Sequence, residues 1–214
     1  MGFQLTSADY VEYINRAYQI IHENGDYVTE LDSATGDGDH WSNINLGFEK
    51  LVEAGEELKT LSLFDEFKKI GTIMMSVIGG SSGVLYGSAY LGAAKTLKGK
   101  EVIENADMCE ILAAMLDSIM SRGNAKPGFK TMIDCLHPAV ECYRECIEKG
   151  LSEQETVKMV KQAAIDGAQN TASLEAVRGR AFYQANKGVG HLDPGAITMS
   201  YQIETLMDFI AEKL

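Results

Sequence analysis

Apolar residues recur at helical spacing along most of the chain. The first such pattern predicts a helix over residues 7–22, with its apolar face formed by Val11, Ile14, Tyr18 and Ile21. Similar patterns predict helices over residues 27–31, 43–58, 63–78, 84–97, 106–120, 131–148 and 153–173, and a last helix from Pro194 to the C-terminus. No segment alternates strictly enough to predict a strand. The pattern therefore predicts one all-α domain of about eight helices over residues 1–214.

Composition agrees with this fold and excludes one class of function, nucleic-acid binding. Hydrophobic residues make up 45% of the 214 positions, which is enough for a sizeable core, and only 3 are proline. There are 19 basic and 31 acidic residues, so the formal net charge is −12. Such a chain lacks the basic balance that nucleic-acid binding requires. An acidic protein that binds phosphate groups is expected to do so through metal ions.

The cysteines and the apolar runs bear on the location of the protein. The 4 cysteines form no Cys-x-x-Cys pair and are expected to be buried, reduced thiols, as is usual in a cytosol. No apolar run reaches the length of a membrane span, and no secretory leader opens the chain. We therefore expect a cytoplasmic protein with neither a membrane nor a nucleic-acid partner.

The first candidate for chemistry is an acidic segment. Asp32, Asp37 and Asp39 follow one another closely, with Gly36 and Gly38 allowing sharp turns between them and His40 directly after. Hard cations such as Mg²⁺ are held by a few carboxylates together with substrate phosphates. One interpretation is a metal–phosphate loop. The other is a solvated acidic turn, because Asp and Gly are common turn residues.

Three further segments at helix ends could bind phosphate. Residues 79–83, Gly-Gly-Ser-Ser-Gly, precede a helix whose N-terminus favours anions. Arg178 and Arg180 could bind phosphate bidentately, and Asp193-Pro194-Gly195 opens the last helix. Taken alone, each segment is explained better as a turn, a solvated surface charge or a helix start. Their occurrence together with the acidic segment favours a nucleotide–phosphate site on a helical bundle.

These blocks, taken in order, resemble a known family, the L subunit of dihydroxyacetone kinase (DhaL). The similar blocks are residues 32–43 with Gly-Asp-Gly-Asp-His, 79–87 with Gly-Gly-Ser-Ser-Gly, 121–132 with Ser-Arg-Gly and Lys-Thr-Met, 179–181 with Gly-Arg-Ala, and 190–196 with Gly-His-x-Asp-Pro-Gly-Ala. The resemblance runs across nearly the whole chain. It implies a barrel of about eight antiparallel helices with a nucleotide at one end.

The resemblance also implies a function. In the phosphotransferase-system type of this kinase, ADP stays bound as a coenzyme. A phosphohistidine on an M subunit converts it to ATP, and the γ-phosphoryl group passes to dihydroxyacetone held on a K subunit. A stand-alone L unit favours this arrangement. Such a protein would act as one subunit of a phosphotransferase, without a catalytic nucleophile of its own.

The resemblance assigns residues to this site. Asp32, Asp37 and Asp39 would hold two Mg²⁺ ions on the bound ADP or ATP. The nucleotide contacts would come from His40, Trp41, Ser42, Asn43, Ser81, Ser82, Gly123, Met132, Arg180, Asp193, Pro194 and Gly195, with Gly123 and Met132 lining the adenine site.

Three positions depart from the family pattern, namely Trp41, Phe129 and Val177. They flank the site, so they bear on the partners and the sugar more than on the nucleotide. Two alternatives therefore stay open: an ATP-dependent kinase subunit acting on another short ketose, and a nucleotide-binding regulatory protein that contacts a transcription regulator. A homodimer is also compatible with the sequence.

Overall fold

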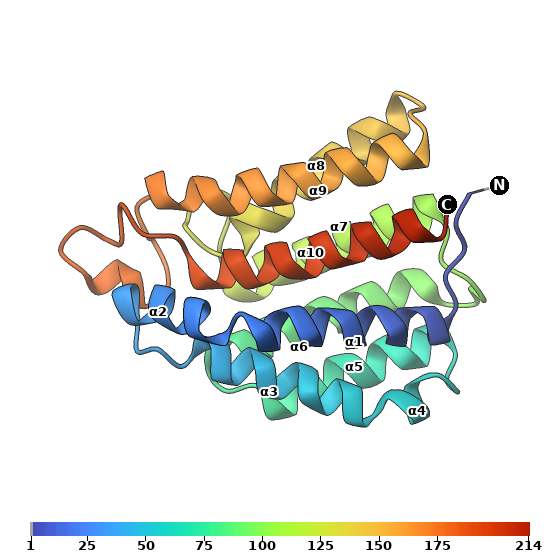
Figure 1. The fold of residues 1–214 in the computed structure, drawn as a ribbon, viewed down its shortest axis with the longest axis horizontal. Helices are drawn as coiled ribbons and strands as arrows, with labels where there is room; N and C mark the ends of the chain where they lie inside the picture. The colour runs from blue at the N-terminus through green and yellow to red at the C-terminus, as the bar shows by residue number, and fades with distance from the viewer. Residues whose placement is uncertain (1) are drawn as a thin grey trace.

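The protein is described by a computed structural model, which covers residues 2–214 (Figure 1). Ten α-helices lie within these residues, together with three short 3₁₀ helices. The α-helices are α1 (Ser7–Glu23), α2 (Gly25–Thr35), α3 (His40–Glu53), α4 (Gly55–Leu58), α5 (Leu63–Val77), α6 (Gly80–Ala94), α7 (Asn105–Gly123), α8 (Ile133–Glu148), α9 (Glu153–Asn170) and α10 (Pro194–Glu212). The 3₁₀ helices are η1 (Lys95–Leu97), η2 (Thr171–Ser173) and η3 (Arg180–Tyr183). The predicted all-α class is confirmed.

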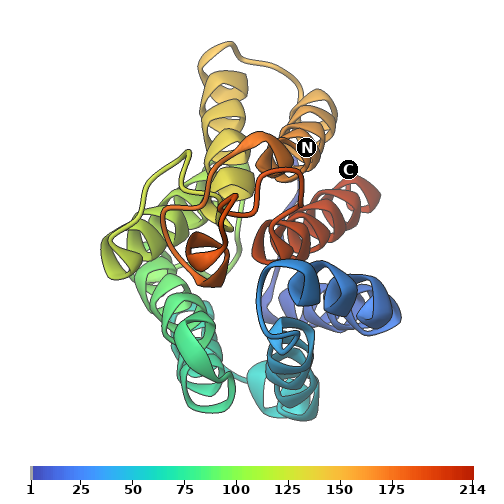
Figure 2. The ribbon, with the colours of Figure 1, turned by 90° about the vertical axis from the view of Figure 1, so that its left-hand side faces the viewer.

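Eight of the helices close into a ring, which Figure 2 shows from one end. Going round it, α1, α3, α5, α6, α7, α8, α9 and α10 each pack against the next, and α10 packs against α1. Successive helices run in opposite directions, and an even number lets the ring close with every neighbour antiparallel. The predicted barrel of about eight helices is thus confirmed. The short helices α2 and α4 are additions at the ends of α1 and α3.

Antiparallel order decides which helix ends meet. The N-termini of α3, α6, α8 and α10 all lie at the end of the barrel that carries α2, away from the two chain termini (Figure 1). The loop between α9 and α10 lies over this same end (Figure 2). Each helix N-terminus carries free N–H groups and a partial positive charge. This end of the barrel therefore gathers four such charges.

The interior is filled by one cluster of buried hydrophobic side chains. Phe67 on α5 is a central member, with its ring centroid 4.5 Å from that of Tyr10 on α1 and 5.7 Å from that of Tyr90 on α6. Such aromatic contacts join three walls of the barrel. None of the helices in the described part of the chain combines the length and the apolar character needed to cross a membrane.

Several helix boundaries differ from the predicted ones. Helix α2 continues to Thr35, so Asp32 belongs to a helix, and α3 already begins at His40. Helix α6 begins at Gly80, four residues earlier than predicted, so the glycine–serine segment forms its first turn. Glycine and serine have low helix propensity, which hides such a start in the sequence. Tight packing of Gly83 against the carbonyl of Ile78 accompanies this turn.

One buried group stands out in the core. Glu66 on α5 is fully buried, and neither of its carboxylate oxygens has a hydrogen-bond partner among the described residues. Burial raises the pKa of Glu66 from 4.5 to about 8, because a charged carboxylate is poorly solvated there. The folded protein therefore keeps Glu66 protonated at neutral pH.

The stability of the barrel is expected to fall between pH 4.5 and pH 8. In this range the unfolded chain has released the Glu66 proton while the folded chain still holds it, so unfolding becomes easier as pH rises, by up to about 1.4 kcal/mol per pH unit. Glu66→Gln should remove this dependence. Urea unfolding of both proteins at several pH values measures it, with Glu110→Gln, an exposed glutamate, as the control. Parallel pH profiles for wild type and Glu66→Gln would contradict the prediction.

Candidate functional site

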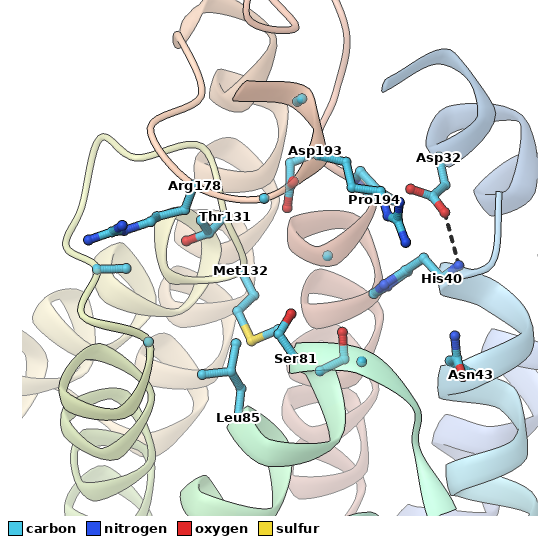
Figure 3. A pocket seen from close by; sticks show the side chains of 18 of the residues that line it. Asp32, His40, Asn43, Ser81, Leu85, Thr131, Met132, Arg178, Asp193 and Pro194 are labelled. Carbon is cyan, nitrogen blue, oxygen red and sulfur yellow. Dashed lines mark hydrogen bonds between the residues drawn. The ribbon is translucent and has the colours of Figure 1, made fainter. Parts of the chain in front are cut away.

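A cavity of about 620 Å³ opens at the end of the barrel where the four N-termini meet (Figure 3). All four helix starts contribute to its wall through His40 of α3, Ser81 of α6, Ile133 of α8 and Pro194 of α10. The acidic segment and the loop between α9 and α10 complete it. A concave site with converging N–H groups and carboxylates is suited to a phosphate-bearing ligand together with a cation.

The acidic segment brings its three carboxylates together. One oxygen from each of Asp32, Asp37 and Asp39 lies within 4.8 Å of the others. Asp32 is buried, and its Oδ2 accepts a hydrogen bond from the backbone N–H of His40 at 2.9 Å, whereas Asp37 and Asp39 are exposed. Three like charges this close repel one another unless a cation lies between them. The set of hard oxygen donors fits a divalent ion such as Mg²⁺.

His40 links the acidic segment to α10. Its Nε2 lies 2.8 Å from Oγ1 of Thr198, and this hydroxyl donates to the backbone oxygen of Pro194 at 3.2 Å. A threonine hydroxyl has one hydrogen, so when that hydrogen is donated to Pro194 the imidazole donates from Nε2. Burial lowers the pKa of His40 in spite of Asp32 and Asp39 nearby. His40 is therefore a neutral, fixed part of the cavity wall.

The start of α10 is capped from within the site. Asp193 is the N-cap of this helix, and its Oδ2 accepts from the N–H of Ala196 at 2.7 Å. Pro194 follows as the first helical residue, as predicted. Desolvation raises the pKa of Asp193 to about 7, while the N–H bond and Lys130 oppose this.

Asn43 joins the acidic segment to the start of α6. Its Nδ2 donates to the backbone oxygen of Asp39 at 3.0 Å, and its Oδ1 accepts from the N–H of Gly79 at 3.2 Å. Gly79 is the N-cap of α6, and no side chain caps this helix. The first N–H groups of α6, at Ser81 and Ser82, therefore remain available in the cavity.

The loop between α9 and α10, residues 171–193, is here called the capping loop. Arg180 on this loop forms an ion pair with Asp37. Gln184 donates to the backbone oxygen of Ala34 at 2.8 Å, which ties the loop to α2. Arg178 lines the cavity but donates through Nη2 to the backbone oxygen of Asn124 at 3.1 Å, toward the end of α7 (Figure 3). The capping loop thus bridges the acidic side and the α7 side of the cavity.

The opposite side of the cavity is less polar. Gly123 at the end of α7 and Met132 before α8 both line it, as do Leu85 and Ile119. Figure 3 shows Met132 and Leu85 on this side. A methyl group added to Gly123 would lie 3.3 Å from Leu85, so the absence of a side chain leaves room there. This region can hold a flat, apolar group such as a nucleobase.

Most of the residues predicted from the sequence line this one cavity. The structure brings together Asp32, Asp37, Asp39, His40, Asn43, Ser81, Ser82, Gly123, Met132, Arg180, Asp193, Pro194 and Gly195. Trp41 and Ser42 are not among the lining residues. Trp41 donates through Nε1 to the backbone oxygen of Ile21 at 2.9 Å and packs against Gly25, so it joins α3 to the turn between α1 and α2. Ser42 donates to the backbone oxygen of Asp39 at 2.8 Å.

Some lining residues were not predicted. Thr35, Lys130 and Thr131 belong to the wall of the cavity. Lys130 and Thr131 lie in the block that includes Met132, but a single lysine in a loop gives no sign in the sequence that its side chain turns inward. Only the packing of the capping loop against this segment brings Lys130 into the site.

Comparison with known proteins identifies the family. The profile of the DAK2 domain matches residues 34–208, which is most of the chain. The chain belongs to the DAK2-domain family. It is 32% identical over 202 residues to the ADP-binding subunit DhaL of the phosphoenolpyruvate-dependent dihydroxyacetone kinase of Escherichia coli (strain K12), covering 94% of this chain and 96% of that protein. This result confirms the resemblance to DhaL that the motifs indicated.

Two other proteins that the chain resembles are longer. The L-erythrulose 1-kinase of Mycolicibacterium smegmatis is 25% identical over 209 residues, which cover 96% of this chain and 36% of that protein. The crystal structure of the dihydroxyacetone kinase of C. freundii in complex with AMP-PNP and Mg²⁺ matches with a TM-score of 0.75 at 23% identity, over 97% of this chain and 35% of that one. The latter likeness establishes the fold.

Proposed function

We propose that this protein is the ADP-binding subunit of a phosphoenolpyruvate-dependent dihydroxyacetone kinase. Its bound ADP or ATP, with Mg²⁺, would relay a phosphoryl group from a phosphohistidine subunit to dihydroxyacetone on a K subunit. The near full-length similarity to an ADP-binding subunit supports this role. One observation in the structure carries it: three clustered carboxylates share a single cavity with the free N-terminus of α6.

Each part of the cavity has a role in this proposal. Asp32, Asp37 and Asp39 would hold two Mg²⁺ ions, which supply positive charge to the phosphates. The N–H groups of Ser81 and Ser82 and the guanidinium of Arg180 would bind phosphate oxygens. The adenine base would lie on the apolar side, at Gly123 and Met132. The residues of this chain would bind and orient the nucleotide without forming a covalent bond to it.

A protein partner is supported by the surface of the capping loop. Tyr183 is 86% exposed, and its ring lies 5.4 Å from that of the partly exposed Phe182. Both belong to η3, directly after Arg180 of the cavity wall. Exposed aromatic side chains are enriched in protein interfaces. A subunit that carries a phosphohistidine or a bound ketone would approach the nucleotide beside these residues, because η3 begins at a residue of the cavity wall. The four free cysteines fit a reducing compartment such as the cytoplasm.

The purified protein is expected to carry ADP and Mg²⁺ through gel filtration. Three carboxylates and a helix N-terminus hold both components together, so a chelator should release the nucleotide as well as the metal. Denaturation followed by ion-exchange chromatography measures the nucleotide, and metal analysis measures the ion. Bound ligand should also raise the midpoint of thermal unfolding. A protein that holds no ADP, and gains no stability from added ADP and Mg²⁺, would contradict the proposal.

The second candidate is a kinase subunit that uses ATP directly and acts on another short ketose. The similarity to an L-erythrulose 1-kinase favours it as the alternative. Exchange with labelled ATP separates the two. A retained coenzyme exchanges slowly and is phosphorylated in place, whereas a substrate site exchanges within the turnover time.

A further inference from the structure

Lys130 lies in the segment between α7 and α8 and is only 2% exposed. Its backbone is left-handed, with φ of 61°, which is uncommon for a residue with a side chain. The ammonium group donates hydrogen bonds to the backbone oxygens of Thr171 and His191. Burial lowers the pKa of Lys130, while Asp193 and Asp134 oppose this change. Its hydrogen bonds therefore hold the side chain in one place, and its burial costs desolvation free energy.

The two carbonyls that Lys130 binds mark the two ends of the capping loop. Thr171 and His191 are twenty positions apart in the sequence, and one ammonium group holds both. The stem of the lysine also runs along the loop, since a Cβ on Gly188 would lie 3.0 Å from its Cε. Next to it, the N–H of Val177 donates to the oxygen of Phe129 at 3.2 Å. The segment at Phe129 and Lys130 is thus the support on which the capping loop rests.

A buried ammonium is stabilising only where hydrogen bonds replace its lost hydration. An apolar side chain of similar length would fill the same space without that desolvation. The reason for an ammonium group at this position is therefore its two acceptors, the backbone oxygens of Thr171 and His191 at the two ends of the capping loop. Because that loop carries Arg178 and Arg180 into the cavity, its position decides whether these side chains reach a ligand.

We propose that Lys130 is a positioning residue that fixes the base of the capping loop and thereby determines how long the nucleotide stays bound. Lys130 acts through the loop and not through contact with the reacting atoms. The acidic cluster lies on α2 and the following turn, whereas the hydrogen bonds of the Lys130 ammonium group go to the capping loop. Loss of the lysine should therefore speed nucleotide release and leave the carboxylates in place. The link to the nucleotide rests on the proposed function.

Lys130→Met tests this inference. The variant keeps the length of the side chain and loses both hydrogen bonds. We expect release of a fluorescent ADP analogue, measured by displacement with excess ADP in the presence of Mg²⁺, to be about tenfold faster than in wild type. The N–H groups of Ala176 and Gly190 donate to the oxygens of Lys187 and Ala172 within the capping loop, at 2.9 and 2.8 Å. Both N–H groups should exchange their hydrogen with solvent faster in the variant. The helices of the barrel should exchange at the wild-type rate.

Two further variants make the test specific. Lys126→Met, an exposed lysine of the same segment, should behave as wild type. Lys130→Arg keeps the positive charge but adds bulk beside Gly188, so it should also release the analogue faster if position is what matters. Lys130→Arg also provides the test of the inference if Lys130→Met does not fold. Wild-type release and wild-type loop exchange in either variant would overturn the inference. If wild-type protein binds no ADP at all, the proposed function fails, and the exchange of the loop still decides the role of Lys130.

Discussion

Asp32→Asn is expected to lower the affinity for Mg²⁺ with ADP by roughly a hundredfold or more. The asparagine oxygen can still accept the N–H of His40, so the turn between α2 and α3 is kept and only the charge is lost. Two unit charges 4 Å apart attract by about 4 kcal/mol at an effective dielectric constant of 20. Titration calorimetry with Mg²⁺ and ADP measures the loss, and nucleotide retention through gel filtration should disappear with it. Asp37→Ala should give the same outcome.

The matched control for this experiment is Asp26→Asn. Asp26 lies on the same helix, is exposed, and is not among the residues that line the cavity. It should bind as wild type does. If Asp32→Asn keeps wild-type affinity for Mg²⁺ and ADP, the assignment of the carboxylate cluster as the metal site is wrong.

Phe67→Ala is expected to destabilise the barrel by about 3–5 kcal/mol, the usual result of removing a buried phenyl ring. Phe67 is fully buried and contacts aromatic rings of α1 and α6, so the cavity left behind lies where three helices meet. Urea unfolding followed by circular dichroism gives the free energy of unfolding. Because the ring is not part of the cavity wall, the folded fraction should bind ADP normally.

Phe64→Ala gives the comparison for this loss. Phe64 lies one turn earlier on α5 and is only partly buried, so its truncation should cost much less. Equal losses from the two substitutions would show that the interior of the barrel near Phe67 is not closely packed.

The helices themselves were largely predictable, because each has an apolar face repeated at helical spacing. Helix α1 is an example, with Val11 and Ile14 both fully buried or nearly so. The predicted start of α10 was also right, since Asp193 and Pro194 form a strong local signal. Helix α6 was predicted to start too late. Its first turn consists of Gly and Ser, and close packing at Gly83 replaces the missing propensity.

The sequence shows which residue types the site contains, but it predicts the place of some of them better than that of others. Asp32, Asp37 and Asp39 are near neighbours in the chain, so a local turn suffices to bring their carboxylates together. Trp41, equally close in sequence, turns the other way, because helix α3 begins at His40 and places the next side chain toward α1. Consecutive residues of a helix point in different directions, so His40 lines the cavity while Trp41 packs toward α1.

Periodicity and short-range spacing are enough to predict an all-α chain, an acidic segment able to hold a cation and several helix starts able to hold phosphate. The meeting of the starts of α3, α6, α8 and α10 at one end of the barrel follows from the folded arrangement of the helices (Figure 1). The folded arrangement also places Arg180 beside Asp37 and turns Lys130 inward to hold the capping loop. These contacts join residues far apart in the chain, and closure of the antiparallel ring brings them together.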